Sequence, residues 1–125
     1  MGATYVNVTV TNPAEPGLAW DGEFLVDTGA LHSAVPRRRL EAIGLQPADT
    51  RKFELADGSV VDMDTGGACL DFMGRTAHAT VVFGADSAEP LLGAIALEDA
   101  GMAVDPVDQS LEPVRHFLYH RRPLD

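Results

Sequence analysis

The sequence has little cysteine and few basic residues. A single cysteine among 125 residues excludes an internal disulfide and any site built on several thiolates, as is typical of a reducing compartment. Nine Lys and Arg residues stand against 19 Asp and Glu residues, which gives a formal net charge of -10 at pH 7. This balance argues against a nucleic-acid binder, because such a protein needs a basic face.

The sequence also lacks a long apolar run, and its first residues do not resemble a signal peptide. No segment approaches the length of a membrane span, and the N-terminus has neither the basic nor the apolar region of a signal peptide. We therefore expect a cytoplasmic protein with no membrane partner. Aromatic residues make up only 6% of the chain, so the core must consist mainly of Val, Leu, Ile, Ala and Met.

The length predicts one compact domain. We expect a lobe over residues 1–112 and a basic, aromatic C-terminal tail over 113–125. In that tail, His116 and His120 are spaced to bind a metal if helical, but no further ligand lies at a suitable spacing. We therefore expect a solvated tail and no metal.

The first quarter of the chain predicts strands. Val6, Val8 and Val10 alternate with polar residues, which indicates a half-buried strand that ends at Asn12-Pro13. Residues 14–22 are rich in turn formers and predict a loop. Residues 23–27 contain the uniformly apolar run Phe24-Leu25-Val26 before Asp27 and predict a strand buried on both faces.

The middle of the chain predicts one helix and further strands. Residues 35–45 indicate a helix, with Ser33 as a possible cap and Gly44 just past its end. Asp57-Gly58 predicts a hairpin turn with positive φ at both positions. Two more strands are expected over 67–74 and 75–84.

One plan occurs twice along the chain. The stretch FLVDTGA (24–30) precedes a helix that ends near Gly44, and EPLLGA (89–94) precedes a second helical segment that ends near Gly101. The two Gly-Ala pairs lie 64 residues apart. This repeat predicts a small β-rich lobe with internal pseudo-symmetry and little helix, without a parallel βαβ array.

These stretches carry a resemblance. The triplet Asp27-Thr28-Gly29 after an apolar run, the turn at Asp57-Gly58 and the later Leu91-Leu92-Gly93 together resemble the retropepsin-like aspartic proteases, in particular their small prokaryotic single-lobe group. The resemblance covers residues 4–112. It implies an all-β acid-protease lobe, a closed or partly open β-barrel with one or two short helices, that functions as a two-fold homodimer.

The resemblance also implies a chemistry. Two Asp27 carboxylates, one from each subunit, would share a proton and activate a water to hydrolyse a peptide bond, with no cofactor and no metal. Thr28 and Gly29 would fix the carboxylate. The substrate would be an extended peptide paired as a strand beneath flaps, in contact with Ala30 and with the flap turn Asp57, Gly58 and Ser59. Because Ala30 cannot donate a hydrogen bond as a serine would, we expect a pH optimum nearer neutral than that of pepsin.

A second Asp-Thr-Gly occurs at residues 64–66. Unlike the first, it has no apolar run before it and no helix after it, and it comes just after the flap turn. We interpret it as a chance recurrence in the returning flap strand. The second catalytic aspartate must then come from a second copy of the chain.

Other interpretations stay open. Asp27 could be only a turn residue at a strand end, and the chain could be a non-catalytic dimeric peptide-binding module that retains the protease fold. A metal hydrolase using Asp27 with His32 or His78 lacks a ligand motif. His32 is also a candidate for lining a substrate pocket. Cys69 is expected to be an inert core residue.

Overall fold

The structure is a computed structural model, and it describes residues 2–115. The expected tail residues His116 and His120 lie outside the described part. The elements in chain order are β1 (Tyr5–Asn12), β2 (Glu15–Val26), β3 (Ser33–Pro36), α1 (Arg37–Ala42), β4 (Asp49–Glu54), β5 (Val60–Phe72), β6 (Arg75–Gly84), β7 (Leu91–Leu92), α2 (Ala94–Ala100), β8 (Met102–Asp105) and β9 (Ser110–Pro113).

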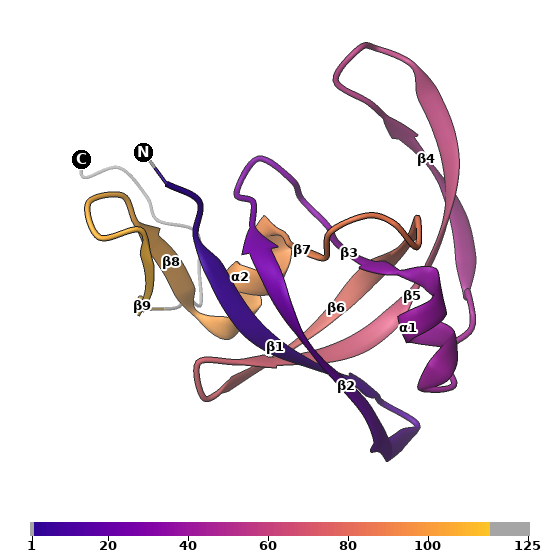
Figure 1. Cartoon of the computed structure of the whole chain (residues 1–125), viewed down its shortest axis with the longest axis horizontal. Coiled ribbons are helices and arrows are strands. Elements are labelled where there is room, and N and C mark those ends of the chain that lie inside the picture. The colour runs from indigo at the N-terminus through magenta and orange to yellow at the C-terminus, as the bar shows by residue number, and fades with distance from the viewer. Residues whose placement is uncertain (1, 116–125) are drawn as a thin grey trace, which may run out of the picture.

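Seven of these strands form one strongly curved sheet (Figure 1). Their order is β1-β2-β7-β3-β6-β5-β4, and an additional pairing of β1 with β5 brings the sheet back onto itself. Strands β2 and β7 pair in parallel, as do β3 and β6. The expected mostly-β lobe of the retropepsin type, with two short helices, is therefore confirmed.

The first hairpin is longer than the sequence predicts. The expected loop over 14–22 is wrong, because β2 begins at Glu15 and pairs with β1 through Trp20 opposite Val10. Backbone pairing with β1 outweighs the turn-forming composition of this stretch. Gly22 leaves room for the Trp20 side chain, since a Cβ there would lie 2.4 Å from the indole ring in its present position.

The turn itself is confined to Pro13 and Ala14. The Asn12 side chain accepts a hydrogen bond from the Ala14 N–H at 2.9 Å and donates one to the Ile43 carbonyl at 2.9 Å. This buried amide thereby ties the β1–β2 turn to the end of α1. Gly44, at φ +80°, lies just past that helix as expected.

One detail of the helices differs from expectation, and the end of the second helix agrees with it. Ser33 is not a helix cap, because it lies in β3 and α1 begins after Pro36 without a side-chain cap. At the other helix, α2 ends at Gly101 in the left-handed region, at φ 70°. The Arg75 guanidinium donates to the Ala100 carbonyl at 3.0 Å, which satisfies a backbone acceptor at that end.

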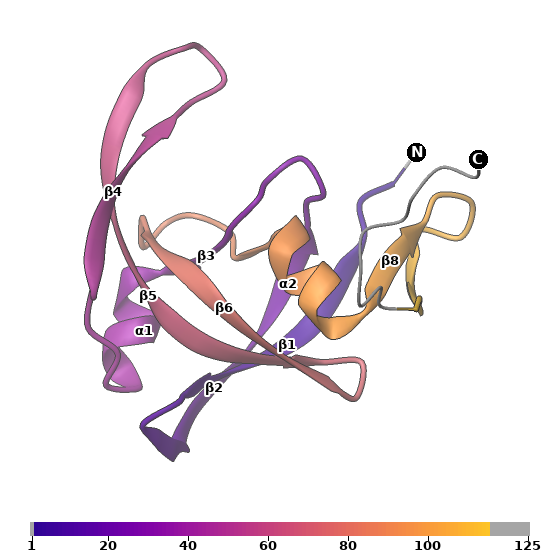
Figure 2. The ribbon, with the colours of Figure 1, turned by 180° about the vertical axis from the view of Figure 1, so that it is seen from behind.

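Strands β4 and β5 form a hairpin that extends away from the barrel (Figures 1 and 2). Its turn differs from the expected two-residue type. Gly58 has φ +87°, Asp57 does not have positive φ, and Leu55 and Ser59 close a three-residue loop. This is a turn followed by one left-handed glycine, the next commonest hairpin connection.

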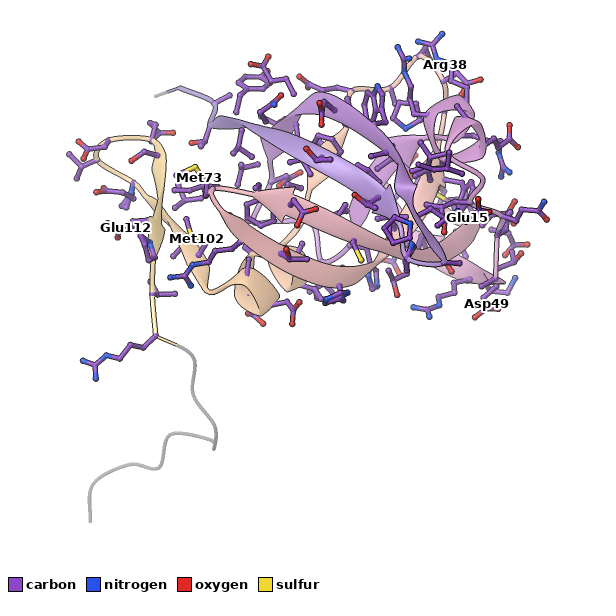
Figure 3. The ribbon with its side chains drawn as sticks, turned by 90° about the horizontal axis from the view of Figure 1, so that it is seen from below. Glu15, Arg38, Asp49, Met73, Met102 and Glu112 are labelled. Atoms are coloured by element: carbon purple, nitrogen blue, oxygen red, sulfur yellow. The ribbon has the colours of Figure 1, made fainter. Side chains whose placement is uncertain are left out.

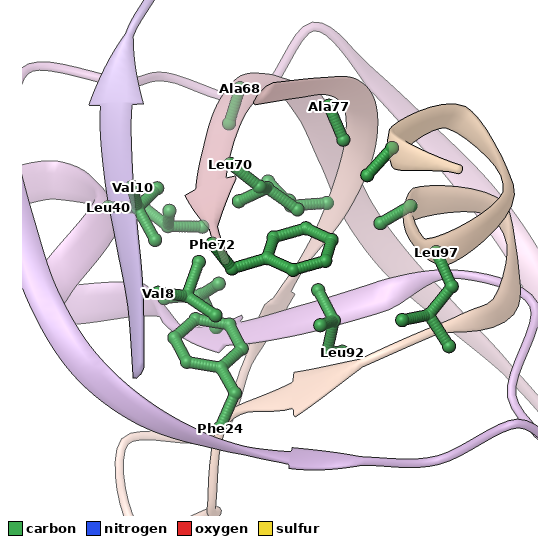
Figure 4. Close-up of a cluster of buried hydrophobic side chains, with 14 of the residues drawn as sticks. Val8, Val10, Phe24, Leu40, Ala68, Leu70, Phe72, Ala77, Leu92 and Leu97 are labelled. Atoms are coloured by element: carbon green, nitrogen blue, oxygen red, sulfur yellow. The ribbon is translucent and has the colours of Figure 1, made fainter. Parts of the chain in front are cut away.

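The core lies inside the curved sheet and is covered by the two helices. Val8, Phe24, Leu70, Phe72 and Leu92 meet there (Figure 4), and each is at least 97% buried. Cys69 is on the opposite face of β5 from Leu70 and is only half-buried, with its Sγ 3.3 Å from His78 Nδ1. The expectation that Cys69 is core is therefore wrong, because strand alternation turns its side chain outward.

The last two described strands form a separate hairpin, β8–β9. It ends at Pro113, and the Thr4 hydroxyl donates to the Gln109 carbonyl near its tip at 3.0 Å. The chain's beginning and the end of its described part therefore lie together. Within residues 2–115, no helix is long and apolar enough to cross a membrane.

Candidate active site

Asp27 follows directly after β2, where the parallel pairing with β7 ends. Its N–H donates to the Leu92 carbonyl at 2.9 Å, and the preceding Val26 N–H donates to the Thr4 carbonyl at 2.8 Å. The backbone on both sides of the aspartate is thus anchored before the chain turns. Asp27 itself is half-buried.

The residues after Asp27 fold back on its carboxylate. The Gly29 N–H donates to Asp27 Oδ1 at 3.0 Å, and the Ala30 N–H donates to the Asp27 carbonyl at 3.2 Å. A Cβ at position 29 would lie 3.2 Å from the same carboxylate oxygen, so glycine allows the close approach. Thr28 and Gly29 are exposed in the single chain.

The second copy of the repeat packs against the first and holds the loop that follows Asp27. Gly93 packs against the backbone of residues 31 and 32, where a Cβ would lie 2.7 Å from the His32 carbonyl. The Gly93 N–H donates to the buried Ser33 hydroxyl at 2.9 Å. The first two N–H groups of α2 donate to the carbonyls of Ala30 and Leu31, at 2.8 and 3.1 Å. The helix start therefore fixes the loop that carries Asp27.

A groove of about 570 Å³ runs between this loop and the β4–β5 hairpin. Its wall from the Asp27 loop includes Gly29, Ala30, Leu31 and His32. The facing wall comes from the hairpin and the barrel, and comprises Arg51, Lys52, Phe53, Glu54, Leu55 and Met63, with Ala34, Val82 and Leu91 at the base. The arrangement can hold an extended chain beside Asp27.

The sequence pointed to only part of this groove. Ala30 lines it, whereas Asp57, Gly58 and Ser59 lie in the exposed hairpin turn and are not among its lining residues. The main omissions are Leu31, Phe53, Leu55 and Met63. Alternation along the hairpin strands could have identified Phe53 and Leu55 on one face, but the facing wall depends on how the hairpin folds over the loop.

The exposed turn is held by its own side chains. Asp57 Oδ1 accepts hydrogen bonds from the Ser59 hydroxyl at 2.6 Å and from the Ser59 N–H at 2.9 Å. These bonds favour the charged form and lower the pKa of the Asp57 carboxyl below its ordinary value. The carboxylate thus stabilises the turn at the tip of the hairpin.

The second Asp-Thr-Gly lies inside β5, the returning strand of the hairpin, as expected. Asp64 accepts a hydrogen bond from the Arg37 guanidinium at 2.5 Å and another from the Thr50 hydroxyl at 2.9 Å. The first of these bonds is the main reason that the pKa of the Asp64 carboxyl is lowered. Asp64 is therefore engaged in a bridge between β5, α1 and β4, away from the groove.

Metal ligation would need several donors in one place. Among residues 2–115, no three His, Cys, Asp or Glu side chains gather closely enough to hold a metal ion. His32 lines the groove, and His78 lies on β6 beside Cys69 on the outer face of the sheet.

The curved lobe carries an aspartate loop that the second copy of the repeat holds in place, and a hairpin projects on the other side of the groove. This is the architecture of a single-lobe acid protease. A model of the family described as "Aspartyl protease" matches residues 8–94, more than half of the chain. This chain belongs to the aspartyl protease family.

Among solved structures, the fold is similar to the solution structure of a simian foamy virus (mac) protease. The TM-score is 0.55 at 18% sequence identity, and the match covers 75% of this chain and 91% of that one. At this identity, the likeness concerns the fold. A search of curated proteins gives no match.

Proposed function

We propose that this chain is an aspartic endopeptidase that acts as a homodimer, with Asp27 from each of two subunits forming the catalytic dyad. The observation that supports this most directly is the position of Asp27: its loop is fixed by Leu92 and by the start of α2, at the edge of a groove large enough for a peptide. Each chain supplies one such aspartate, since Asp64 is engaged by Arg37.

The shape of the lobe supports a dimer across one end. The Asp27 loop, the tip of the β4–β5 hairpin and the turn of the β8–β9 hairpin all extend toward the same end of the molecule (Figures 1 and 2). Large apolar side chains are exposed on these parts, with Leu31 66% exposed and Val107 87% exposed. A two-fold axis at this end would bring both Asp27 loops together and cover these side chains.

The dyad would work through proton sharing. One Asp27 carboxylate accepts a proton from a water molecule, whose oxygen attacks the scissile carbonyl, while the protonated Asp27 of the partner subunit donates to the carbonyl oxygen. The resulting tetrahedral diol then collapses: its C–N bond breaks, the amine nitrogen takes the proton held by the first Asp27, and one diol hydroxyl returns its proton to the Asp27 carboxylate of the partner subunit as the C=O bond reforms. A carboxylic acid and an amine are released, and the dyad again holds one proton. The exposed Thr28 is available to bond across to the partner loop, as the family resemblance implies.

The substrate would be an extended peptide held beneath the β4–β5 hairpin, which acts as a flap. The groove walls are largely apolar, and the hairpin pairs with the barrel only along β5, so the exposed edge of β4 can open and close over a ligand. The acidic composition suits a freely diffusing protease of the cytoplasm, without nucleic acid or membrane as a partner.

Paired substitutions of the two Asp-Thr-Gly motifs test the proposal. Asp27→Asn keeps the size of the side chain but cannot act as base, so peptide hydrolysis should fall by several orders of magnitude while fold and dimer persist. Asp64→Asn is the matched control and should leave hydrolysis within a few-fold of wild type. Cleavage of a broad peptide library between pH 4 and 8 is the measurement.

Two outcomes would count against the proposal. Full activity in Asp27→Asn with loss in Asp64→Asn would assign the chemistry to the other motif. A wild-type protein that is dimeric but cleaves nothing in the library would favour the alternative, a non-catalytic dimeric module that binds peptides in the same groove.

A further inference from the structure

His32 stands out among the groove residues because it is polar on a largely apolar wall. His32 lies two residues after Ala30, and its ring faces the β4–β5 hairpin. The centroids of the His32 and Phe53 rings are 5.8 Å apart. The side chain is half-buried. It therefore lies where a substrate side chain beside the scissile bond would enter.

The two ring nitrogens of His32 have different surroundings. Nδ1 is buried and has no hydrogen-bond partner among the described residues. A buried N–H without an acceptor is costly, and the tautomer with its proton on Nδ1 would create one. The proton of the imidazole therefore belongs on Nε2, the nitrogen that is not buried. His32 accordingly presents an N–H donor, and not an acceptor, to the groove.

The neighbouring side chains make this donor selective. Leu31, Phe53 and Met63 offer no hydrogen bond, so a polar substrate side chain that enters here can pair only with His32 or with the charged lining residues of β4. Of the charged residues nearby, Arg51 and Lys52 have acidic partners in Asp49 and Asp62. Glu54 has no salt-bridge partner within the described residues and would repel a carboxylate.

We propose that His32 is a specificity-determining residue that selects substrates with a carboxamide side chain, Asn or Gln, at one position near the scissile bond. The carboxamide oxygen accepts the Nε2–H bond and carries no charge to be repelled by Glu54. This inference rests on the proposed function, because it takes the groove to be the substrate site of a protease.

Matched peptides and matched variants test it. Asn and Leu are close in size but differ in hydrophobicity, so the hydrogen bond is isolated by how the ratio of kcat/KM for Asn and Leu peptides, at each position within three residues of the cleaved bond, changes between the wild type and the His32 variants. In the wild type we expect one position at which kcat/KM is about threefold to tenfold higher for Asn, the worth of one neutral hydrogen bond. His32→Gln keeps a side-chain N–H donor and should retain the preference. His32→Leu should abolish it, and His78→Leu, on the outer face, should leave it unchanged.

A preference that is absent from the wild type, or unchanged in His32→Leu, would overturn the inference. Imidazole ¹⁵N spectra give a second, activity-independent measurement: we expect a hydrogen on Nε2 and an unprotonated Nδ1, and an Nδ1–H tautomer would also overturn it. If the wild type cleaves no peptide, the catalytic proposal fails, and the same Asn and Leu peptides are then compared by binding to the wild type. Equal dissociation constants at every position would overturn the role of His32 independently.

Discussion

The backbone N–H of Asp27 donates to the carbonyl of Leu92 at 2.9 Å, across 65 residues of sequence. This bond joins the two copies of the repeated plan, because Asp27 directly follows β2 and Leu92 ends β7, and these strands pair in parallel. The aspartate is thus held by the second copy of the repeat rather than by its own neighbours alone. Substitutions far along the chain should therefore disturb it.

Gly93→Ala should destabilise the lobe. The added Cβ would lie within 2.8 Å of the backbone of both Leu31 and His32, which cannot move without shifting the Asp27 loop. We expect a loss of about 1–3 kcal/mol in the free energy of unfolding, as for other overpacked sites, together with weakened hydrolysis. Gly67→Ala is the control, since no atom lies within 4 Å of its Cβ position. Urea unfolding measures the stability of both variants, and equal stability of Gly93→Ala and Gly67→Ala would contradict the close packing at Gly93.

The Arg37–Asp64 bridge should make stability depend on pH. Arg37 lowers the pKa of folded Asp64 below the ordinary value of 3.8, so the stabilisation is fully present above pH 3.8 and is lost as pH falls through the lowered value. Asp64→Asn should therefore unfold at a lower temperature than the wild type at pH 7, and the gap should shrink at acid pH.

Thermal unfolding between pH 2 and 7 measures this difference in unfolding temperature between the wild type and Asp64→Asn. Asp62→Asn, on the same strand, is the control: its bridge to Lys52 joins two well-exposed side chains and should contribute little. A gap for Asp64→Asn that stays constant down to pH 2 would show that the bridge does not stabilise the fold.

The β4–β5 hairpin should be mobile when the groove is empty. Its outer strand pairs on one side only, and residues 54–60 at its tip are exposed, so local opening should cost little. Hydrogen exchange over residues 53–62 should be fast in the free protein and slower with a statine-type inhibitor bound. The same protection in both states would argue against a flap.

Val107→Asp should weaken the dimer. Val107 lies in the turn of the β8–β9 hairpin and is 87% exposed in the single chain, and a charge there would oppose burial against a second copy. Sedimentation should show more monomer and hydrolysis should fall at low protein concentration.

Met73→Asp is the matched control for this change. Met73, labelled in Figure 3, is 55% exposed but lies in the turn between β5 and β6, which in Figure 1 is at the opposite end of the molecule from the Asp27 loop. It should leave the association unchanged. A strict monomer in the wild type at high concentration would leave Asp27 without a partner carboxylate and remove the dyad mechanism.

Local patterns were enough to predict much of this molecule. The alternation of Val6, Val8 and Val10 indicated β1, Gly44 marked the end of α1, and the two Gly-Ala stretches indicated the repeat and the aspartate loop. Each of these signals depends on residues close in sequence, because the alternation of side chains and the conformational freedom of glycine determine local backbone structure directly. Long-range pairing was invisible to them, so β2 was predicted to begin too late.

The sequence by itself determined the β lobe, its repeat and Asp27 at the end of a strand, because strand alternation and turn chemistry are local properties of the chain. The expected burial of that strand on both faces is wrong, since only Phe24 is buried and Leu25 and Val26 are half-buried in the single chain. Only the tertiary structure decided that Arg37 engages Asp64, that Cys69 faces outward beside His78, and that Phe53 lies opposite His32 across a groove. These contacts join residues from different strands and helices. Their existence depends on how the sheet curves and pairs, which no short stretch of sequence specifies.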